Sequence, residues 1–438
     1  MSDFKRQKIE KPVANRCEYI VTKKNKTKQC GMMRKKENKY CAEHMIYDTS
    51  SSNTKRISCP LNPNHTVWET DLKFHLTKCN ANPKVNKNSY FELDINSNLQ
   101  NYEEFMFETE STRRNDQHYR DILDNLSFEP LDLHICEHPG LTTQLESKTY
   151  KKHIVQQSSL IGNLKRLGLL SSEHFYLEYG CGKAELSRYV NQCIIFKNVN
   201  DFKSYGYGLI DRGNNRMKAD SKIIQDSEPY KFTPRIKRAK IDIKDLKLDE
   251  FLDNIKPKQI VAISKHLCGA ATDLTLKSII NSSIIKDNQF SGILIAMCCR
   301  HVCSDDQLLP QSKQFLYDHG FKSVDAFNRL KKMVSWAVNI KEERSKSDAI
   351  DKNEESKENE GKEDEHSKNE DEESSCLTSA QRYEYGLKAR KLIDESRLHA
   401  LRTILGDEYD VNIFWYVESN ITKENVCLSI TKKNSKDK

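Results

Sequence analysis

Short apolar runs alternate with longer amphipathic segments from about residue 150 to the C-terminus. The runs have the length of strands, and several end at a glycine or a charged residue. We predict strands at 174–180, 205–211, 239–243, 259–264, 292–297, 411–417 and 426–432. Helices are expected between them, above all at 183–193, 270–283, 307–318 and 379–404. This alternation is typical of an α/β fold in which helices cover both faces of a sheet.

The first predicted strand ends in a glycine turn. Gly180, Cys181 and Gly182 separate the run HFYLEY from the helical segment KAELSRYVNQC. A strand, a glycine turn and a helix open a nucleotide-binding βαβ unit. The third glycine of the dinucleotide fingerprint is missing, and Glu178 completes the pattern E-x-G-x-G. The pattern favours a Rossmann-like class I methyltransferase domain that binds S-adenosylmethionine rather than NAD.

Acidic residues near the ends of the next two strands strengthen that interpretation. Asp211 ends the second strand, where a carboxylate can accept two hydroxyl donors of a ribose. Asp242 belongs to the third strand region and is placed to face an adenine. For both aspartates, an acid at a turn without a ligand is the alternative. The predicted cofactor-binding residues are Glu178, Gly180, Gly182, Asp211 and Asp242.

Lys265 and His266 follow the fourth strand in the sequence SKHLCG. Ligands of open α/β sheets bind at the carboxyl ends of the strands. The Asn/Asp-Pro-Pro-aromatic loop with which base-amino methyltransferases grip a flat amine is not found here, which favours an oxygen nucleophile. A ribose hydroxyl needs help in losing its proton, and Lys265 or His266 is the predicted catalytic group. Either residue can instead pack or bind a phosphate.

The fifth strand ends in the cysteine-rich sequence CCRHVC at 298–303, and Cys268 is near it in the expected topology. We expect these thiols to line the floor of a pocket, with Arg300 or His301 meeting the substrate. A third metal site is one alternative. A cysteine nucleophile for transfer to a pyrimidine carbon is the other.

Two clusters of cysteine and histidine lie within the first 79 positions. Their spacings are C-x12-C-x10-C-x2-H and C-x5-H-x9-H-x3-C, each with the four donors that a closed structural zinc site needs. The predicted ligands of two zinc ions are Cys17, Cys30, Cys41, His44, Cys59, His65, His75 and Cys79. Ordinary buried cysteines and disulfides are the alternatives. The charged N-terminus is unlike a signal peptide, so we expect a reducing compartment.

Charge is distributed unevenly over the 438 residues. The segment 341–375 holds 15 acidic and 7 basic residues, a net charge of −8, which predicts a disordered acidic insert. The net charge of +7 therefore leaves +15 for the rest. Thirteen basic and three acidic residues between Lys5 and Lys39 favour nucleic-acid binding. No apolar run approaches the length of a membrane span, so we expect a soluble protein without a membrane partner.

These features together predict the domain organisation. A CCCH finger at 14–47 and a CHHC finger at 56–83 precede a linker at 84–112. The methyltransferase domain then comprises 113–340 and 376–434, interrupted by the insert at 341–375.

Taken in order, these motifs resemble the eukaryotic tRNA 2'-O-methyltransferases that act on nucleotide 4 of the acceptor stem. The matching stretches are 17–44, 59–79, 151–170, 177–187, 238–246, 264–276, 298–303 and 385–397. The resemblance implies methyl transfer from S-adenosylmethionine to a ribose hydroxyl of tRNA. It also implies cofactor roles for Glu178, Gly180, Gly182 and Asp211, and it leaves the general base open.

An RNA-binding adaptor with a non-catalytic Rossmann-like domain is the competing hypothesis, and the intact cofactor motif argues against it. A methyltransferase acting on RNA bases or on protein is a third. We further expect a monomer in the cytoplasm, the nucleus or both, with the nucleolus as one nuclear site.

Overall fold

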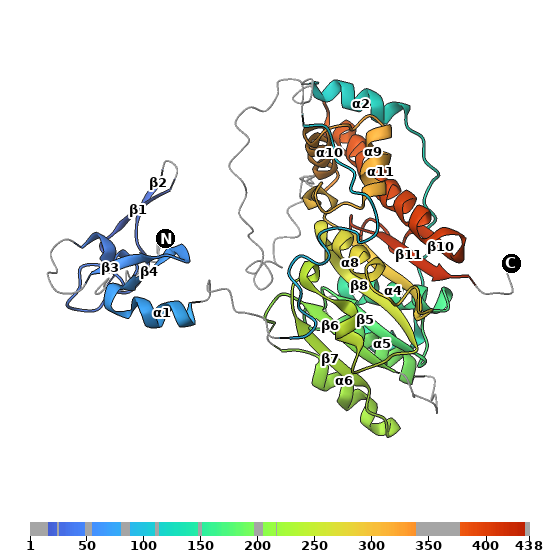
Figure 1. The fold of residues 1–438 in the computed structure, drawn as a ribbon, viewed down its shortest axis with the longest axis horizontal. Coiled ribbons are helices and arrows are strands. Elements are labelled where there is room, and N and C mark those ends of the chain that lie inside the picture. The colour runs from blue at the N-terminus through green and yellow to red at the C-terminus, as the bar shows by residue number, and fades with distance from the viewer. Residues whose placement is uncertain are drawn as a thin grey trace, which may run out of the picture. The chain divides into compact units, whose positions relative to one another are not determined.

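The computed structural model describes nine stretches of the chain, which form two compact units, residues 1–87 and 88–438 (Figure 1). The described residues are 16–23, 26–48, 55–79, 88–109, 114–147, 151–196, 205–215, 217–338 and 377–433. The insert predicted at 341–375 lies outside them. No helix in the described stretches is long and apolar enough to cross a membrane.

The first unit consists of two small hairpins with short helices. The hairpin strands are β1 (Ile20–Lys23) with β2 (Lys26–Gln29) and β3 (Arg56–Cys59) with β4 (Asn62–Trp68). The helices are η1 (His44–Tyr47), η2 (Glu69–Asp71) and α1 (Leu72–Lys78). α1 carries His75 and ends one residue before Cys79, whose amide donates to the His75 carbonyl at 2.7 Å. Cys41 precedes η1, and its carbonyl accepts hydrogen bonds from the His44 and Met45 amides at 3.0 Å.

The second unit contains a seven-stranded sheet with the order β10-β11-β9-β8-β5-β6-β7. Its strands are β5 (His174–Tyr179), β6 (Gly206–Asp211), β7 (Arg235–Lys240), β8 (Gln259–Cys268), β9 (Phe290–Cys298), β10 (Tyr409–Trp415) and β11 (Val426–Lys432). β11 pairs antiparallel with both of its neighbours, and the other pairings are parallel. The predicted α/β class is confirmed. Because the chain runs outward from β5 to β7 and returns to β8, the order reverses between β5 and β8, where ligands bind in such sheets.

Alternate residues of β5 enter two different apolar cores, one on each face of the sheet. Phe175, Leu177 and Tyr179 join one core, and Tyr176 joins the other. The first core is covered by α7 (Leu248–Leu252), α8 (Ala270–Ile280) and α11 (Ser379–Leu405). The second is covered by α4 (Lys151–Arg166), α5 (Glu185–Ile195) and α6 (Asp220–Ser227). Burial on both faces explains the nearly continuous apolar runs in the sequence.

A third core joins helices from distant parts of the chain. It gathers α2 (Asp116–Asn125), α9 (Pro310–Asp318), α10 (Val324–Trp336) and the first half of α11, which are grouped together in Figure 1. The remaining short helices are η3 (Pro139–Leu141), α3 (Thr142–Ser147), η4 (Glu228–Tyr230), η5 (Ile243–Asp245), η6 (Arg300–Val302) and η8 (Gly406–Glu408).

The third strand differs most from the sequence prediction. It spans Arg235–Lys240 rather than 239–243, because four residues of this edge strand are basic and its apolar residues, Ile236 and Ala239, do not alternate. Asp242 consequently lies beyond the strand and caps η5, where its side chain accepts a hydrogen bond from the Lys244 amide at 3.2 Å.

Part of the segment interpreted as a linker packs against the sheet domain. Leu99 and Phe107 are buried, and the buried side-chain amide of Asn96 donates to the carbonyls of Ile243 and Leu246 at 2.7 and 2.8 Å. Residues 88–109 thus belong to the second unit, and the linker prediction for 84–112 is wrong over that stretch.

Candidate functional site

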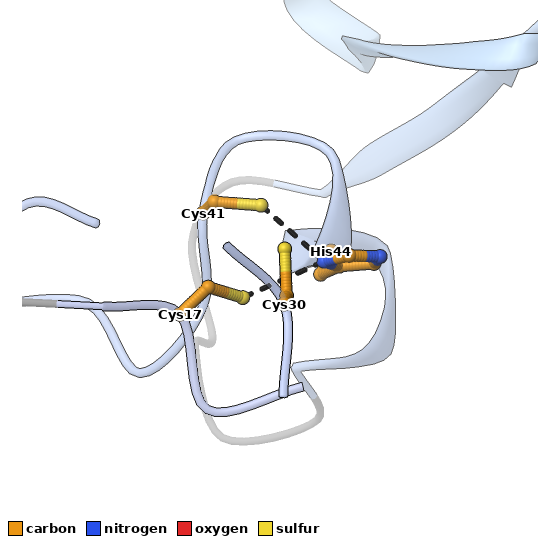
Figure 2. Close-up of side chains that lie close together, drawn as sticks. All are labelled: Cys17, Cys30, Cys41 and His44. Carbon is orange, nitrogen blue, oxygen red and sulfur yellow. Dashed lines mark hydrogen bonds between the residues drawn. The ribbon is translucent and has the colours of Figure 1, made fainter. Parts of the chain in front are cut away.

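The four predicted ligands of the first finger converge on one point (Figure 2). The Nδ1 atom of His44 lies 3.5 Å from Cys17 Sγ and 3.3 Å from Cys41 Sγ. All four donor atoms lie within 4.8 Å of one another. The cysteines are buried, and the ring of Tyr19 stacks on His44 with centroids 4.0 Å apart, which fixes the imidazole plane.

The second finger brings its ligands together from β3, β4 and α1. Cys59 Sγ and Cys79 Sγ are 3.7 Å apart, and the Nε2 atoms of His65 and His75 are 3.1 Å apart. Zinc bonds of about 2.3 Å to sulfur and about 2.0 Å to nitrogen give tetrahedral edges of roughly 3.8 Å for S···S and 3.3 Å for N···N. The observed separations therefore fit one tetrahedral zinc ion.

The glycine turn after β5 is held by the ends of neighbouring strands. Asp211 accepts hydrogen bonds from the amides of Gly182 at 2.7 Å and Gly213 at 2.6 Å. Gly180 and Gly182 have φ angles of 63° and 49°, a region that favours glycine. A side chain at Gly182 would meet no atom within 4 Å, so its backbone borders open space. The predicted residues Gly180, Gly182 and Asp211 thus form one cradle at the sheet edge.

Arg238 holds the same turn from the edge strand β7, a role that the sequence analysis missed. Its guanidinium donates to the Gly182 carbonyl at 3.0 Å. It also forms a two-point ion pair with Asp220 at 2.9 and 2.7 Å.

Glu178 is placed beneath the cradle rather than in it. The side chain is buried, and its carboxylate accepts hydrogen bonds from the Ser187 amide at 3.1 Å and the Ser187 hydroxyl at 2.5 Å. Burial raises the pKa of Glu178 to about 7. The carboxylate anchors the first turn of α5, and its contact with a cofactor stays a prediction. Contact of Asp242 with the cofactor also stays a prediction. Its carboxylate lies 3.8 Å from the guanidinium of Arg212.

Lys265 and His266 occupy an irregularity of β8. Ser264 pairs with Ile295 and Leu267 with Met297, so β8 carries one extra residue there. Such bulges redirect side chains and are frequent beside active sites. The irregularity brings the His266 carbonyl against Gly180, 3.2 Å from where a β-carbon of that glycine would lie. The structure therefore joins the predicted catalytic pair to the predicted cofactor cradle.

His153, from α4, completes this basic group. Its Nδ1 atom lies 2.9 Å from Lys265 Nζ, and its ring centroid is 6.3 Å from that of His266. Partial desolvation and the positive charges of Lys265 and His153 lower the pKa of His266 to about 4. The imidazole of His266 is therefore neutral at pH 7, with an unprotonated nitrogen that can accept a hydrogen bond.

Nuclear magnetic resonance titration of the His266 ring is expected to show no protonation between pH 7 and pH 5. Lys265→Met should raise the pKa of His266, because it removes a neighbouring positive charge. Lys258→Met, which changes an exposed lysine before β8, is the matched control and should leave the value unchanged. A wild-type pKa near the ordinary value of about 6.5 would contradict this electrostatic description.

A cavity of about 750 Å³ lies at the same edge of the sheet, between the β10–β11 connection and α11. β11 begins there, since its second residue, Cys427, pairs with Ala296 near the end of β9. The lining includes Phe128, Tyr383, Trp415 and Lys423. The sequence analysis missed this cavity because its aromatic and basic residues come from three distant segments.

Two residues of the CCRHVC sequence are not where a substrate can reach them. Arg300 is fully buried and donates to Asp394 at 3.0 and 2.9 Å, so the expected contact of Arg300 with substrate is wrong. Cys303 is buried in the third core. The sulfur atoms of Cys268, Cys298 and Cys299 instead form a separate group within 4.8 Å of one another.

Comparison with known families accounts for both units. Residues 155–431 match the family described as "Methyltransferase TRM13". Residues 15–45 match the "CCCH zinc finger in TRM13 protein", and residues 56–80 match the "U11-48K-like CHHC zinc finger". These matches and the ligand geometry support zinc at both N-terminal clusters.

Several yeast proteins are similar over nearly their whole length, and all carry the name "tRNA:m(4)X modification enzyme TRM13". The protein of Scheffersomyces stipitis is 48% identical, over 92% of this chain and 98% of its own. That of Debaryomyces hansenii is 45% identical, over 98% of this chain and 95% of its own. That of Saccharomyces cerevisiae is 33% identical, over 95% and 96%. The resemblance found in the sequence is thereby confirmed, and this chain belongs to the TRM13 methyltransferase family.

Proposed function

We propose that this protein methylates tRNA, transferring the methyl group of S-adenosylmethionine to the ribose 2'-hydroxyl of nucleotide 4 in the acceptor stem. Family membership supports methyl transfer, and the name shared by the relatives supports tRNA as the substrate. The observation that carries the proposal is the cradle of Gly182 and Asp211, which lies directly beside the Lys265–His266 bulge at the switch point of the sheet.

The cradle has the donors and acceptors that the cofactor requires. S-adenosylmethionine, when bound, supplies an electrophilic methyl group. The backbone at Gly180 and Gly182 gives close approach to the amino-acid part, because no side chain stands in the way. The Asp211 carboxylate accepts one amide bond on each oxygen and retains lone pairs for ribose hydroxyls.

His266 and Lys265 provide complementary functions for an oxygen nucleophile. The neutral imidazole has an unprotonated nitrogen that can accept a hydrogen bond from the 2'-hydroxyl, but a pKa of about 4 makes it a weak base, so the hydroxyl proton leaves only as the methyl group is transferred. Lys265 and His153 lie next to His266, and their positive charge favours binding of a backbone phosphate of the tRNA. Alignment of the hydroxyl supplies most of the remaining rate enhancement.

The first unit suits recognition of a double-stranded stem. The sequence of the β1–β2 hairpin includes Lys23, Lys26 and Lys28, and Lys23 pairs with Lys26 in the strand ladder. A-form RNA is recognised mainly through phosphates, shape and 2'-hydroxyls in its shallow groove, so base flipping is not needed. The cavity beside α11 adds aromatic rings on which an unpaired nucleotide can stack, together with the cation of Lys423.

The test is transfer of labelled methyl to tRNA that lacks the modification, followed by digestion to nucleosides. Wild type should yield a labelled 2'-O-methylnucleoside, and partial digestion to acceptor-stem fragments should place the label at position 4. Asp211→Ala should reduce transfer by on the order of 100-fold, because charge-assisted hydrogen bonds contribute about 1.5–3 kcal/mol each. Asp226→Ala is the matched control, since Asp226 pairs with Arg188 away from the cradle, and it should retain activity.

Other outcomes discriminate between the competing hypotheses. No transfer with intact tRNA binding would favour the RNA-binding adaptor. Label on a base would identify a base, rather than a ribose, as the acceptor of the methyl group. Calorimetry with S-adenosylhomocysteine separates a loss of cofactor binding from a loss of chemistry in the Asp211→Ala protein.

A further inference from the structure

Three thiols meet at the carboxyl edge of the sheet, outside both fingers. Cys268 and Cys298 are the last residues of β8 and β9 and are paired in register. Their sulfur atoms are 3.0 Å apart. Cys299 follows with a φ of 50°, and this left-handed turn brings its sulfur into the same group. The zinc-finger families match only 15–45 and 56–80, so they do not cover these residues.

The composition of this group is that of a soft metal site. Thiolates are preferred ligands of zinc, and three of them fill three positions of a tetrahedron. Acidic side chains are not part of the group, which argues against a hard cation such as magnesium.

A fourth donor stands two residues further along the chain. The Nδ1 atom of His301 is buried and has no hydrogen-bond partner among the described residues. An unsatisfied buried polar atom is unfavourable, and a metal bond would satisfy it. His301 lies in η6, which begins one residue after Cys299, and its nitrogen is outside the group of three sulfur atoms, so its side chain must rotate to complete the site.

We propose that Cys268, Cys298, Cys299 and His301 bind a third zinc ion. The sulfur atoms of Cys268 and Cys298 then move from 3.0 Å to roughly 3.8 Å apart, the S···S edge of a tetrahedral zinc site. Cys268 is exposed and is free of the packing that would prevent such a rotation. The ion ties the ends of β8 and β9 together directly after the bulge that carries His266, and thereby fixes the position of that ring.

The decisive measurement is the zinc content of the full-length protein, purified without added metal and with chelator in the final wash. Wild type should hold three zinc ions per chain. Cys299→Ala and His301→Ala should each hold two. Cys136→Ala, which changes a partly buried cysteine outside the three groups, is the matched control and should retain three.

Two results would overturn the proposal. One is a wild-type protein with two zinc ions, whether its three edge thiols titrate freely or Cys268 and Cys298 have formed a disulfide. The other is a Cys299→Ala protein that retains three. The wild-type count decides the matter even if the variants fold poorly, and it does not depend on the proposed methyl transfer.

Discussion

Cys79→Ala is expected to release one zinc ion and unfold the second finger while residues 88–438 stay folded. The finger has little else to hold it, because α1 has seven residues with none buried. Isolated helices shorter than about 12–15 residues are marginal in water. Zinc binding to finger peptides is worth about 10–16 kcal/mol, so loss of a ligand removes the main stabilising contribution.

Zinc content, limited proteolysis and tRNA binding report this change separately. We expect one ion fewer than wild type, rapid cleavage within 56–79 and weaker tRNA binding, with an unchanged melting transition for the second unit. Thr77→Ala is the matched control, since Thr77 lies exposed on the same helix and its hydroxyl donates to the Phe74 carbonyl at 2.8 Å. A Cys79→Ala protein that keeps its zinc and its protease resistance would show that the metal does not hold this finger together.

The central strands were predictable because both of their faces are buried. In β5 and β9 nearly every residue is apolar and inaccessible, so the run of hydrophobic letters marks the strand directly. β7 was missed because four of its six residues are basic and its two apolar residues, Ile236 and Ala239, pack on opposite faces of the sheet. Residues 88–109 were not recognised as part of the folded domain for another reason. Their burial depends on hydrogen bonds such as that of Asn96 to Ile243, a residue 147 positions away.

The same division applies to the site. The zinc ligands and the glycine turn were predictable because their spacing is local and their chemistry is restrictive. The residues that contact them were not predictable from local spacing. Lys265 contacts His153, which is 112 positions away, and Arg238 contacts Gly182, which is 56 positions away. Arg300 illustrates the opposite error. A basic residue at the end of a strand suggests a substrate contact, but the Arg300 side chain is buried and forms an ion pair with Asp394.

Arg397→Leu is expected to destabilise the second unit by about 3–5 kcal/mol and to lower its melting temperature by on the order of 5–10 °C. Its guanidinium donates to both oxygens of Asp273 at 2.9 and 2.8 Å, and neither side chain is more than 2% exposed. The substitution therefore leaves a buried carboxylate without its counter-ion. Calorimetry of the full chain measures the change, and Lys388→Leu is the control because its ion pair with Asp124 is partly exposed and is worth under about 1 kcal/mol.

A double variant tests the cause of that loss. Asp273→Leu with Arg397→Leu removes both charges together, so it should recover much of the stability that the single substitution loses. The pair joins α8, which follows the cysteine at the end of β8, to α11, which lines the large cavity. Arg397→Leu should therefore reduce methyl transfer. Its effect on the zinc content of the fingers should be smaller, because the fingers belong to the other unit. Equal instability of the single and double variants would mean that lost packing, rather than the unpaired Asp273, determines the effect.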